Sequence, residues 1–322
     1  MKAVFKFLIP SLVKSGASRN TFCALIILIF SQTSLCQTPD STSRQKTNTK
    51  RYHVNYLTGS GILAAGLVTD YFAIKQLQSK PQITDAELLA LNTDVITPID
   101  RWALHQDPSQ RKTFSKISDV MQPPLFVILP VLLGLDKKIR KDWLDILFMY
   151  AEGHIITFTI YNYSWFGAMF QDRFRPLTYY TELSLPERQA SGNRNSMFSG
   201  HVGSTAFASF FIAKVYCDYH PEIGAAKYLL YTAALVPPAV MGYLRVRALA
   251  HFPSDDLIGF TLGAAVGIIL PEIHKFNYKG ISLGMLCTPQ SMGLSLCWKI
   301  PVHKFSGKEK SSFANLMAPK QM

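Results

Sequence analysis

The feature that most restricts the fold of this chain is a series of apolar stretches that follow one another closely in its second half. Most of them approach the length at which a helix crosses a bilayer, about 20 residues. Little of the sequence alternates in the manner of strands. We therefore expect an all-α membrane helical bundle of about five to six spans, drawn from residues 57–76, 123–136, 143–166, 197–216, 226–244 and 255–272.

Polar residues inside these stretches carry information about packing. Glu152, His154 and Asn162 lie within 143–166, so this helix should face other helices and not lipid. We interpret His154 as a hydrogen-bonded structural histidine. Pro237 and the following Pro238 should kink the 226–244 stretch, because proline cannot donate a backbone hydrogen bond.

The sequence predicts four regions along the chain. A basic start, the apolar run 22–30 and small residues before Gln37 indicate that 1–36 is a signal peptide or an uncleaved membrane anchor. Residues 37–56 form a polar linker, and 57–272 form the helical domain, in which 84–120 is expected to be amphipathic and not to span. Residues 273–322 form a basic tail, where the strand-like sequences around Gly280 and Gly293 could pair as a short hairpin.

Charge and cysteine content narrow the class of protein. The formal net charge is +12, but the basic residues are scattered between apolar spans, so they suit cytoplasmic loops and anionic head groups and not nucleic acid. No pair among the five cysteines has the C-x-x-C spacing, so a zinc or redox centre has no support. Cys287 and Cys297 are the only candidates for a disulfide.

Loop charges orient the predicted bundle. The connection 136–142 has four basic residues in seven and should be cytoplasmic. Counting onward, the 167–197 and 245–254 loops are then external. A cleaved signal peptide would conflict with this order if 57–76 also spans. Three alternatives stay open. In the first, 57–76 does not span; in the second, the leader remains as an anchor and 57–76 still does not span; in the third, 57–76 is the first span and the leader stays in the cytoplasm.

Three short motifs fall where this count places external helix ends: residues 172–176, 195–201 and 242–255. Arg175 and Arg245 come from separate motifs and could grip one phosphate from two sides with planar, always-charged groups. Ser199 and Gly200 open a helix, where backbone N–H groups and the helix dipole favour an anion. These motifs predict a site for a phosphoryl group.

Two histidines in the same motifs suit a two-step transfer. One can attack phosphorus while the other protonates the leaving oxygen, and His251 and His201 are the candidates. Asp255 follows His251 by four residues. At helical spacing it could reach that ring and keep one nitrogen protonated.

The motifs resemble the type 2 phosphatidic acid phosphatase superfamily, with its Lys-x6-Arg-Pro, Pro-Ser-Gly-His and Ser-Arg-x5-His-x3-Asp patterns. The resemblance, which covers about 155–272, implies that His251 is the nucleophile, His201 the general acid and Asp255 the residue that orients His251. It implies that Arg175, Arg245, Ser199 and Gly200 bind phosphate. It also implies an all-α fold and hydrolysis without a metal or other cofactor.

The sequence departs from this pattern at three positions. The family lysine falls on Ala168, the proline before Ser-Gly-His is Phe198, and the serine before the third-motif arginine is Leu244. One phosphate-binding cation is therefore missing. Arg173, Arg194 and Arg247 are the candidate substitutes, although the motif places none of them there. A degenerate member without catalysis stays open.

We expect a metal-independent phosphatase of the inner membrane with its site facing the periplasm or exterior. It would hydrolyse a lipid-linked phosphomonoester or pyrophosphate through a phosphohistidine. The expected partners are the lipid phosphate substrate and membrane lipids, with the oligomeric state open. The alternatives are a non-catalytic phospholipid-binding membrane protein and a relative of soluble acid phosphatases or vanadium haloperoxidases.

Overall fold

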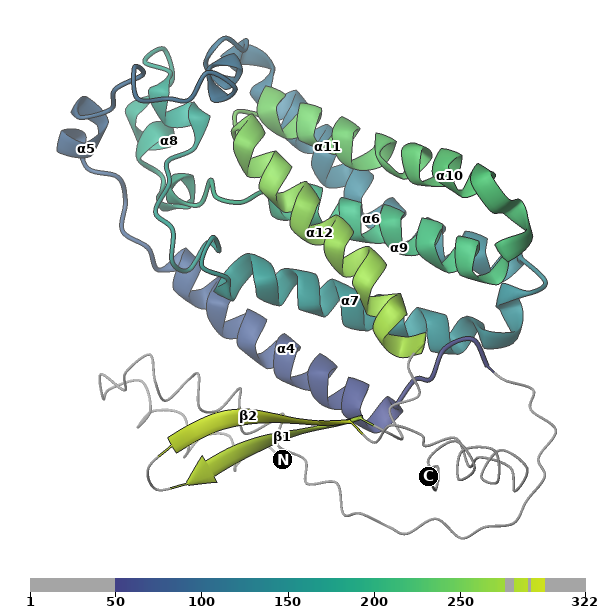
Figure 1. Ribbon diagram of the computed structural model, residues 1–322. Helices are drawn as coiled ribbons and strands as arrows, with labels where there is room; N and C mark the ends of the chain where they lie inside the picture. The colour runs from purple at the N-terminus through teal and green to yellow at the C-terminus, as the bar shows by residue number, and fades with distance from the viewer. Residues whose placement is uncertain (1–49, 276–280, 289–290, 299–322) are drawn as a thin grey trace, which may run out of the picture. The chain divides into compact units, whose positions relative to one another are not determined.

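A computed structural model describes residues 50–275, 281–288 and 291–298 (Figure 1). By its contacts the chain divides into a helical unit, Gln45–Phe276, and a second unit that combines the two terminal segments. The predicted signal peptide or anchor, 1–36, lies outside the described residues. So does most of the predicted linker, but its last residues are packed: Tyr52 is 1% exposed and its hydroxyl donates to Asp218 at 2.8 Å.

The described part of the helical unit consists of α-helices joined by loops and short 3-10 turns. The α-helices are α4 (Tyr56–Gln78), α5 (Asp85–Leu89), α6 (Arg111–Leu135), α7 (Trp143–Tyr163), α8 (Leu185–Gln189), α9 (Gly200–Tyr219), α10 (Lys227–Ala234), α11 (Val236–Arg247) and α12 (Pro253–Lys275). The 3-10 turns are η1 (Asp100–Leu104), η2 (Pro108–Gln110), η3 (Ile139–Asp142), η4 (Pro176–Tyr179), η5 (Ser191–Arg194) and η6 (Pro221–Ala226).

In the second unit, β1 (Ile281–Thr288) and β2 (Ser291–Trp298) form an antiparallel pair. The register places Ile281 opposite Trp298 and Thr288 opposite Ser291.

The predicted helical bundle is confirmed, and several of its helices suit a membrane. Among the described residues, four helical segments are long and apolar enough to cross one: Tyr56–Gln78, Pro108–Leu135, Pro221–Arg247 and Pro253–Lys275. Helices α7 and α9 lie among the others, and α7 carries buried polar side chains such as Glu152 and Asn162. A helix surrounded by protein can carry such groups where a lipid-facing helix cannot.

Helix α9 lies at the centre of the unit and packs most extensively on α12. Glycines permit this close approach. A Cβ added at Gly263 would stand 1.9 Å from the carbonyl oxygen of Gly203, and one at Gly259 would stand 2.5 Å from that of Ser199. Small residues allow helix backbones to meet in this way. The packing brings the start of α9 beside the start of α12, where two of the predicted motifs lie.

The prediction for residues 84–120 was wrong at its end. From Arg111 onward the chain belongs to α6, which continues without a break through Pro123, Pro124 and Pro130 to Leu135. The charges of its first turns suggested a separate amphipathic segment. In the fold they occupy the end of a long helix, where polar side chains can face a polar pocket while the rest of the helix crosses apolar surroundings.

Near Pro237 and Pro238, where a kink is predicted, the structure shows a boundary between two helices. The helical segment is interrupted at Leu235, which separates α10 from α11. The two prolines fall in the first turn of α11, where their missing N–H groups would have had no intrahelical partner.

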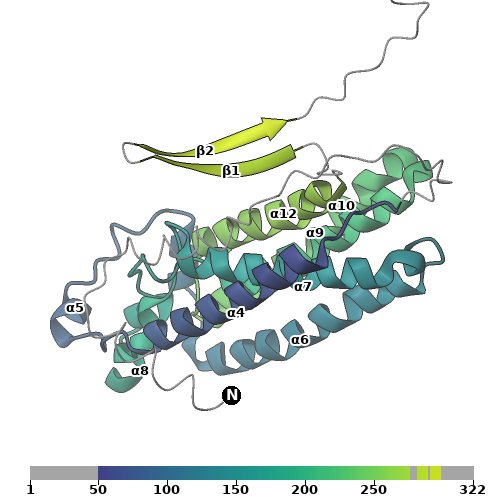
Figure 2. The same cartoon turned by 90° about the horizontal axis from the view of Figure 1, so that it is seen from below.

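Helix α4 runs in the same direction as α7, and the two lie side by side in Figures 1 and 2. At their starts, Lys50 and Tyr56 both bind Asp145. Just beyond their ends, Lys80 donates to the backbone of Ala168. Of the three alternatives for 57–76, this arrangement favours a first span that begins at the same end of the bundle as the basic loop 136–142.

Candidate active site

The predicted site residues gather at one end of the helical unit, opposite to the loop 136–142. They come from the loop after α7, from the first turns of α9 and α12, and from the end of α11, and they are Arg175, His201, Arg245, His251 and Asp255. Both guanidinium groups lie close enough to both imidazoles to act on them electrostatically. Segments far apart in the chain therefore meet around one place, as the motifs predicted.

A cavity of ≈ 400 Å³ opens at this place. Arg175, Arg245 and Asp119 line it, together with Leu249 and Ala250, which immediately precede His251 in the chain. The first turns of α6 form another wall. The cavity has the concave shape and converging charged groups expected of a site for a small anionic group.

The end of α11 turns the chain toward this cavity. Leu249 has φ 56°, in the left-handed region that usually ends helices at glycine, and it is fully buried. The backbone N–H of Ala250 donates back to the carbonyl of Arg245 at 3.1 Å. This tight end holds His251 a short distance from the arginine of the same motif.

His251 is 2% exposed, and its Nδ1 lies 2.6 Å from the carbonyl oxygen of Ser196. A carbonyl can only accept, so Nδ1 carries the proton and Nε2 keeps its lone pair. Burial lowers the pKa of His251 well below its ordinary value, and the guanidinium groups of Arg175 and Arg245 lower it further. The ring is thus held neutral, as a nucleophile must be.

Asp255 differs from the expectation, because it does not hydrogen-bond the ring of His251. Its carboxylate accepts from the hydroxyl of Ser196 at 2.6 Å and from the backbone N–H of Phe252 at 2.9 Å, and it pairs with Arg173. Ser196 bridges the two groups, since its hydroxyl binds Asp255 while its carbonyl binds His251. Asp255 is thus linked to the histidine through Ser196 and not by direct contact.

His201 stands in the first turn of α9, and its side chain is 28% exposed. Its Nε2 lies 3.1 Å from Oδ1 of Asp119 on α6. The same oxygen lies 3.4 Å from Nη1 of Arg245. One carboxylate oxygen therefore joins the predicted general acid to a predicted phosphate-binding arginine.

The two arginines have donors to spare. Arg245 is 5% exposed and donates to Ser118 Oγ at 3.0 Å, but its Nε has no partner among the described residues. Within the described part of the chain, the side chain of Arg175 makes one long bond, 3.5 Å, to the carbonyl of Asn195, and its Nε has no partner. Buried donors without partners are rare and costly, so two such arginines at one cavity indicate an anion-binding site.

Ser199 and Gly200 start α9 as predicted, with Ser199 at the N-cap. The backbone N–H of Ser199 is not directed at the cavity, because it donates to the carbonyl of Asp255 at 3.2 Å. Gly200 lies against the ring of Tyr161, where an added Cβ would come to 3.4 Å. The helix start is therefore held by α7 and α12 from both sides.

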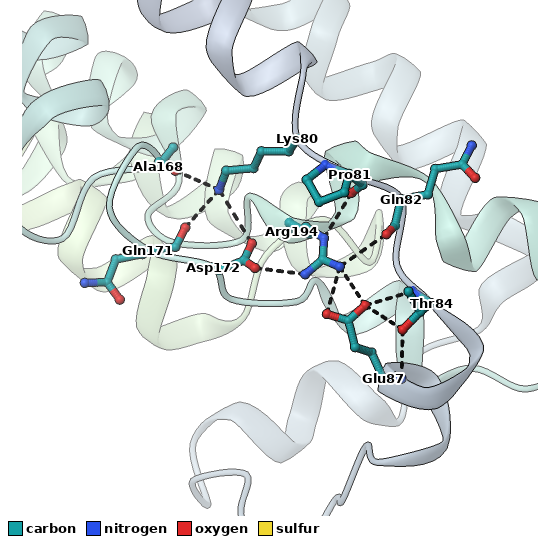
Figure 3. Close-up of polar contacts among 9 residues, drawn as sticks. All are labelled: Lys80, Pro81, Gln82, Thr84, Glu87, Ala168, Gln171, Asp172 and Arg194. Carbon is teal, nitrogen blue, oxygen red and sulfur yellow. Dashed lines mark hydrogen bonds and ion pairs between the residues drawn. The ribbon is translucent and has the colours of Figure 1, made fainter. Parts of the chain in front are cut away.

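Residue 168, where the family pattern has a lysine, is an alanine and places no cation in the cavity. Ala168 is fully buried, and Lys80 reaches its neighbourhood, donating to the carbonyls of Ala168 at 2.9 Å and Gln171 at 3.0 Å (Figure 3). Asp172 lies 3.6 Å from the same ammonium group. Lys80 thus satisfies backbone oxygens and does not line the cavity.

None of the three arginines considered as substitutes is available. Arg173 pairs with Asp100 and Asp255. Arg194 is bound on every side of its guanidinium group, as Figure 3 shows. Arg247 stacks on Phe114 with its Cζ 4.5 Å from the ring centroid. The missing charge is not replaced from these positions.

Sequence reasoning missed Ser196, Asp119 and Lys80. The role of Ser196 depends on its carbonyl, which every residue has, so no residue type could reveal it. Asp119 did have a signal: it follows Arg111 and Ser115 at intervals of four, on one face of a helix. That signal was lost because α6 was expected to begin further along the chain.

His154, interpreted as a hydrogen-bonded structural residue, lies away from the site. It is enclosed by Phe126, Tyr150 and Phe207, at ring-centroid distances of 4.4, 4.6 and 4.7 Å. Its two ring nitrogens have no hydrogen-bond partner among the described residues. The structural role holds, but aromatic packing supports it and not hydrogen bonds.

Comparison with known families agrees with the motifs. Residues 143–279 match the model of the PAP2 superfamily. The matched part contains all the predicted site residues. A comparison with curated proteins finds no match.

Among solved structures, the chain is similar to the crystal structure of a transmembrane PAP2-type phosphatidylglycerolphosphate phosphatase from Bacillus subtilis. The two share 21% identity with a TM-score of 0.38, over 66% of this chain and 94% of that chain. A similarity at this level carries no information on the substrate of the present chain.

Proposed function

We propose that this protein is an integral-membrane phosphatase that hydrolyses a lipid-linked phosphomonoester or pyrophosphate through a phosphohistidine on His251. The observation that carries the proposal is that two imidazoles lie near two incompletely paired guanidinium groups, which line one cavity. The neutral, buried ring of His251, with Nε2 free, supports its role as the nucleophile.

The chemistry follows from these groups. Nε2 of His251 attacks phosphorus, and the bond from phosphorus to the leaving oxygen breaks as His201 donates a proton to that oxygen. Water then attacks the phosphohistidine, His201 takes its proton, and the P–N bond breaks to release phosphate. Arg175 and Arg245 stabilise the charge that develops on the equatorial oxygens. No step needs a metal.

The apolar helices favour a lipid substrate. With four helical segments suited to a membrane and the site at one end of them, the phosphate of a lipid can enter the cavity while its tails stay in the bilayer. The same helices argue against the soluble-enzyme alternative. A binding protein without turnover remains the second candidate, because Ala168 removes one cation of the family pattern.

A screen of phosphate release tests the function. The purified full-length chain is incubated in EDTA with an undecaprenyl pyrophosphate, a phosphatidic acid, a phosphatidylglycerol phosphate and a lipid A phosphate. We expect release from at least one of the four. Phosphate binding without release from any of them would favour the non-catalytic alternative, and activity that EDTA abolishes would contradict the metal-free mechanism.

We further propose that the site faces the periplasm or exterior, because the basic loop 136–142 lies at the opposite end of the bundle. In a cysteine-free background, Glu182→Cys should react with a membrane-impermeant maleimide in intact cells. Lys137→Cys, in the basic loop, should react only after the cells are permeabilised. The reverse pattern would place the site in the cytoplasm.

A further inference from the structure

Helix α6 presents a basic face to the cavity that the family motifs do not include. Lys112 and Lys116 are one helical turn apart, and both line the cavity together with Arg175 and Arg245. Lys116 has no ion pair with any carboxylate in the described part of the chain. Lys112 has one distant partner, Glu187, at 3.5 Å, and Arg111 binds the same carboxylate oxygen.

Asp119, on the same face of α6, indicates where an anion binds. Its Oδ1 lies 3.1 Å from His201 Nε2 and 3.4 Å from Arg245 Nη1. This oxygen contacts both a proton donor and a phosphate-binding group, which are the contacts that a phosphate oxygen would need. Lys116 precedes Asp119 by three residues, so its ammonium group can reach the same part of the cavity.

The site lacks one of the cations that the family pattern provides for phosphate binding. The family pattern supplies a lysine at the position of Ala168, and no other cation considered for that role is free. Lys80, Arg173, Arg194 and Arg247 are all bound elsewhere. Besides Arg175 and Arg245, the cavity wall carries Lys116, which has no ion pair among the described residues, and Lys112, whose one ion pair, with Glu187, is 3.5 Å long.

We propose that Lys112 and Lys116 bind the phosphate of the substrate and supply the charge that is missing at position 168, and that Asp119 competes with this phosphate for His201 and Arg245. The inference rests on the proposed function and deepens it, because it names residues that determine how tightly the phosphate is held.

The test measures phosphate affinity in the full-length chain, purified in dodecyl maltoside without phospholipid. Inorganic phosphate is titrated calorimetrically and also used as a competitive inhibitor of a short-chain phosphomonoester. The double variant Lys112→Ala/Lys116→Ala should weaken phosphate binding about three- to twentyfold, the range for two partly exposed charges. Asp119→Asn should strengthen it about two- to fivefold by the same reasoning.

Lys137→Ala is the matched control, since it removes the same charge just beyond the other end of α6 and should leave the affinity unchanged. Equal phosphate affinity in the double variant and in Lys137→Ala would overturn the inference. So would a loss that appears only in anionic vesicles and not in detergent, because the lysines would then bind bilayer phosphates.

The calorimetric titration separates this inference from the proposed function. The wild-type protein could bind phosphate through the α6 lysines and yet release none from any lipid. That result would refute the proposed phosphatase function and support the inference. If the wild-type protein is active but its phosphate affinity does not depend on either lysine, the phosphatase proposal is supported and the inference is refuted.

Discussion

Replacing His251 by alanine should lower the rate of phosphate release by at least about 10⁴-fold, because the attacking atom is removed and the remaining groups cannot form a phosphoenzyme. The measurement is steady-state phosphate release from the best lipid substrate of the screen. When the protein is incubated briefly with a ³²P-labelled lipid, the wild type should carry an acid-labile radioactive label, as expected of a phosphohistidine. His251→Ala should carry none.

Two controls accompany this variant. His105→Ala removes an exposed histidine outside the cavity and should retain full activity. His201→Ala should slow release about 10²- to 10⁴-fold, and the loss should be smallest for a substrate with a good leaving group, since that step needs least help from an acid. A His251→Ala protein that is folded and fully active would refute the mechanism.

Replacing Arg194 by alanine should produce the largest loss of stability among single changes around the site. Arg194 is 5% exposed, and its guanidinium group binds the carbonyls of Pro81 and Gln82 and the carboxylates of Asp172 and Glu87 (Figure 3). Alanine would leave these acceptors without their shared donor. We expect the midpoint of thermal unfolding to fall by about 5 °C or more.

The same change should also reduce catalysis. The backbone on either side of Arg194 pairs with the loop that carries Arg175, whose N–H donates to Asn193 at 2.8 Å, and it leads directly to Ser196. Ser196 in turn holds His251. We expect kcat to fall at temperatures at which the variant is still folded, whereas Arg140→Ala, an exposed arginine at the other end, should change neither kcat nor stability.

The pH dependence checks the cause of this loss. Hydrogen bonds from Arg194, and from Thr84 after it, lower the pKa of Glu87 from 4.5 to about 2. A carboxylate with a lowered pKa stabilises the fold above its unfolded pKa and loses that effect as the pH falls toward the folded value. The difference in the free energy of unfolding between the wild type and Arg194→Ala should therefore become smaller as the pH falls from 4.5 to about 2. A constant difference would show that the ion pair with Glu87 contributes little.

The sequence predicted much of the site because its groups are defined by short, local patterns. His251 and Arg245 are six residues apart, and Ser199 caps a helix that begins at Gly200, where the motif places it. Local chemistry also predicted the break before Pro237 and Pro238. In each case the physical cause acts over a few residues, so the order of residues is enough to state it.

Other features depend on which distant segments meet. The orienting role expected of Asp255 assumed that the nearest partner along a helix would be the partner in space. Ser196 stands between them, brought from 55 residues away by the packing of α9 on α12. Likewise, Arg194 is bound by the carboxylate of Glu87, which lies 107 residues earlier in the chain.

By itself, then, the order of residues determined the helical class, the chemistry of the motif side chains and the starts of the helices that present them, because turn geometry, apolar length and ionic character are properties of short segments. The tertiary structure alone decided which charges are free to bind substrate. A guanidinium or ammonium group pairs with whatever carboxylate the fold brings within reach, so only the packing shows that Arg173 and Arg194 are engaged while Lys116 faces the cavity.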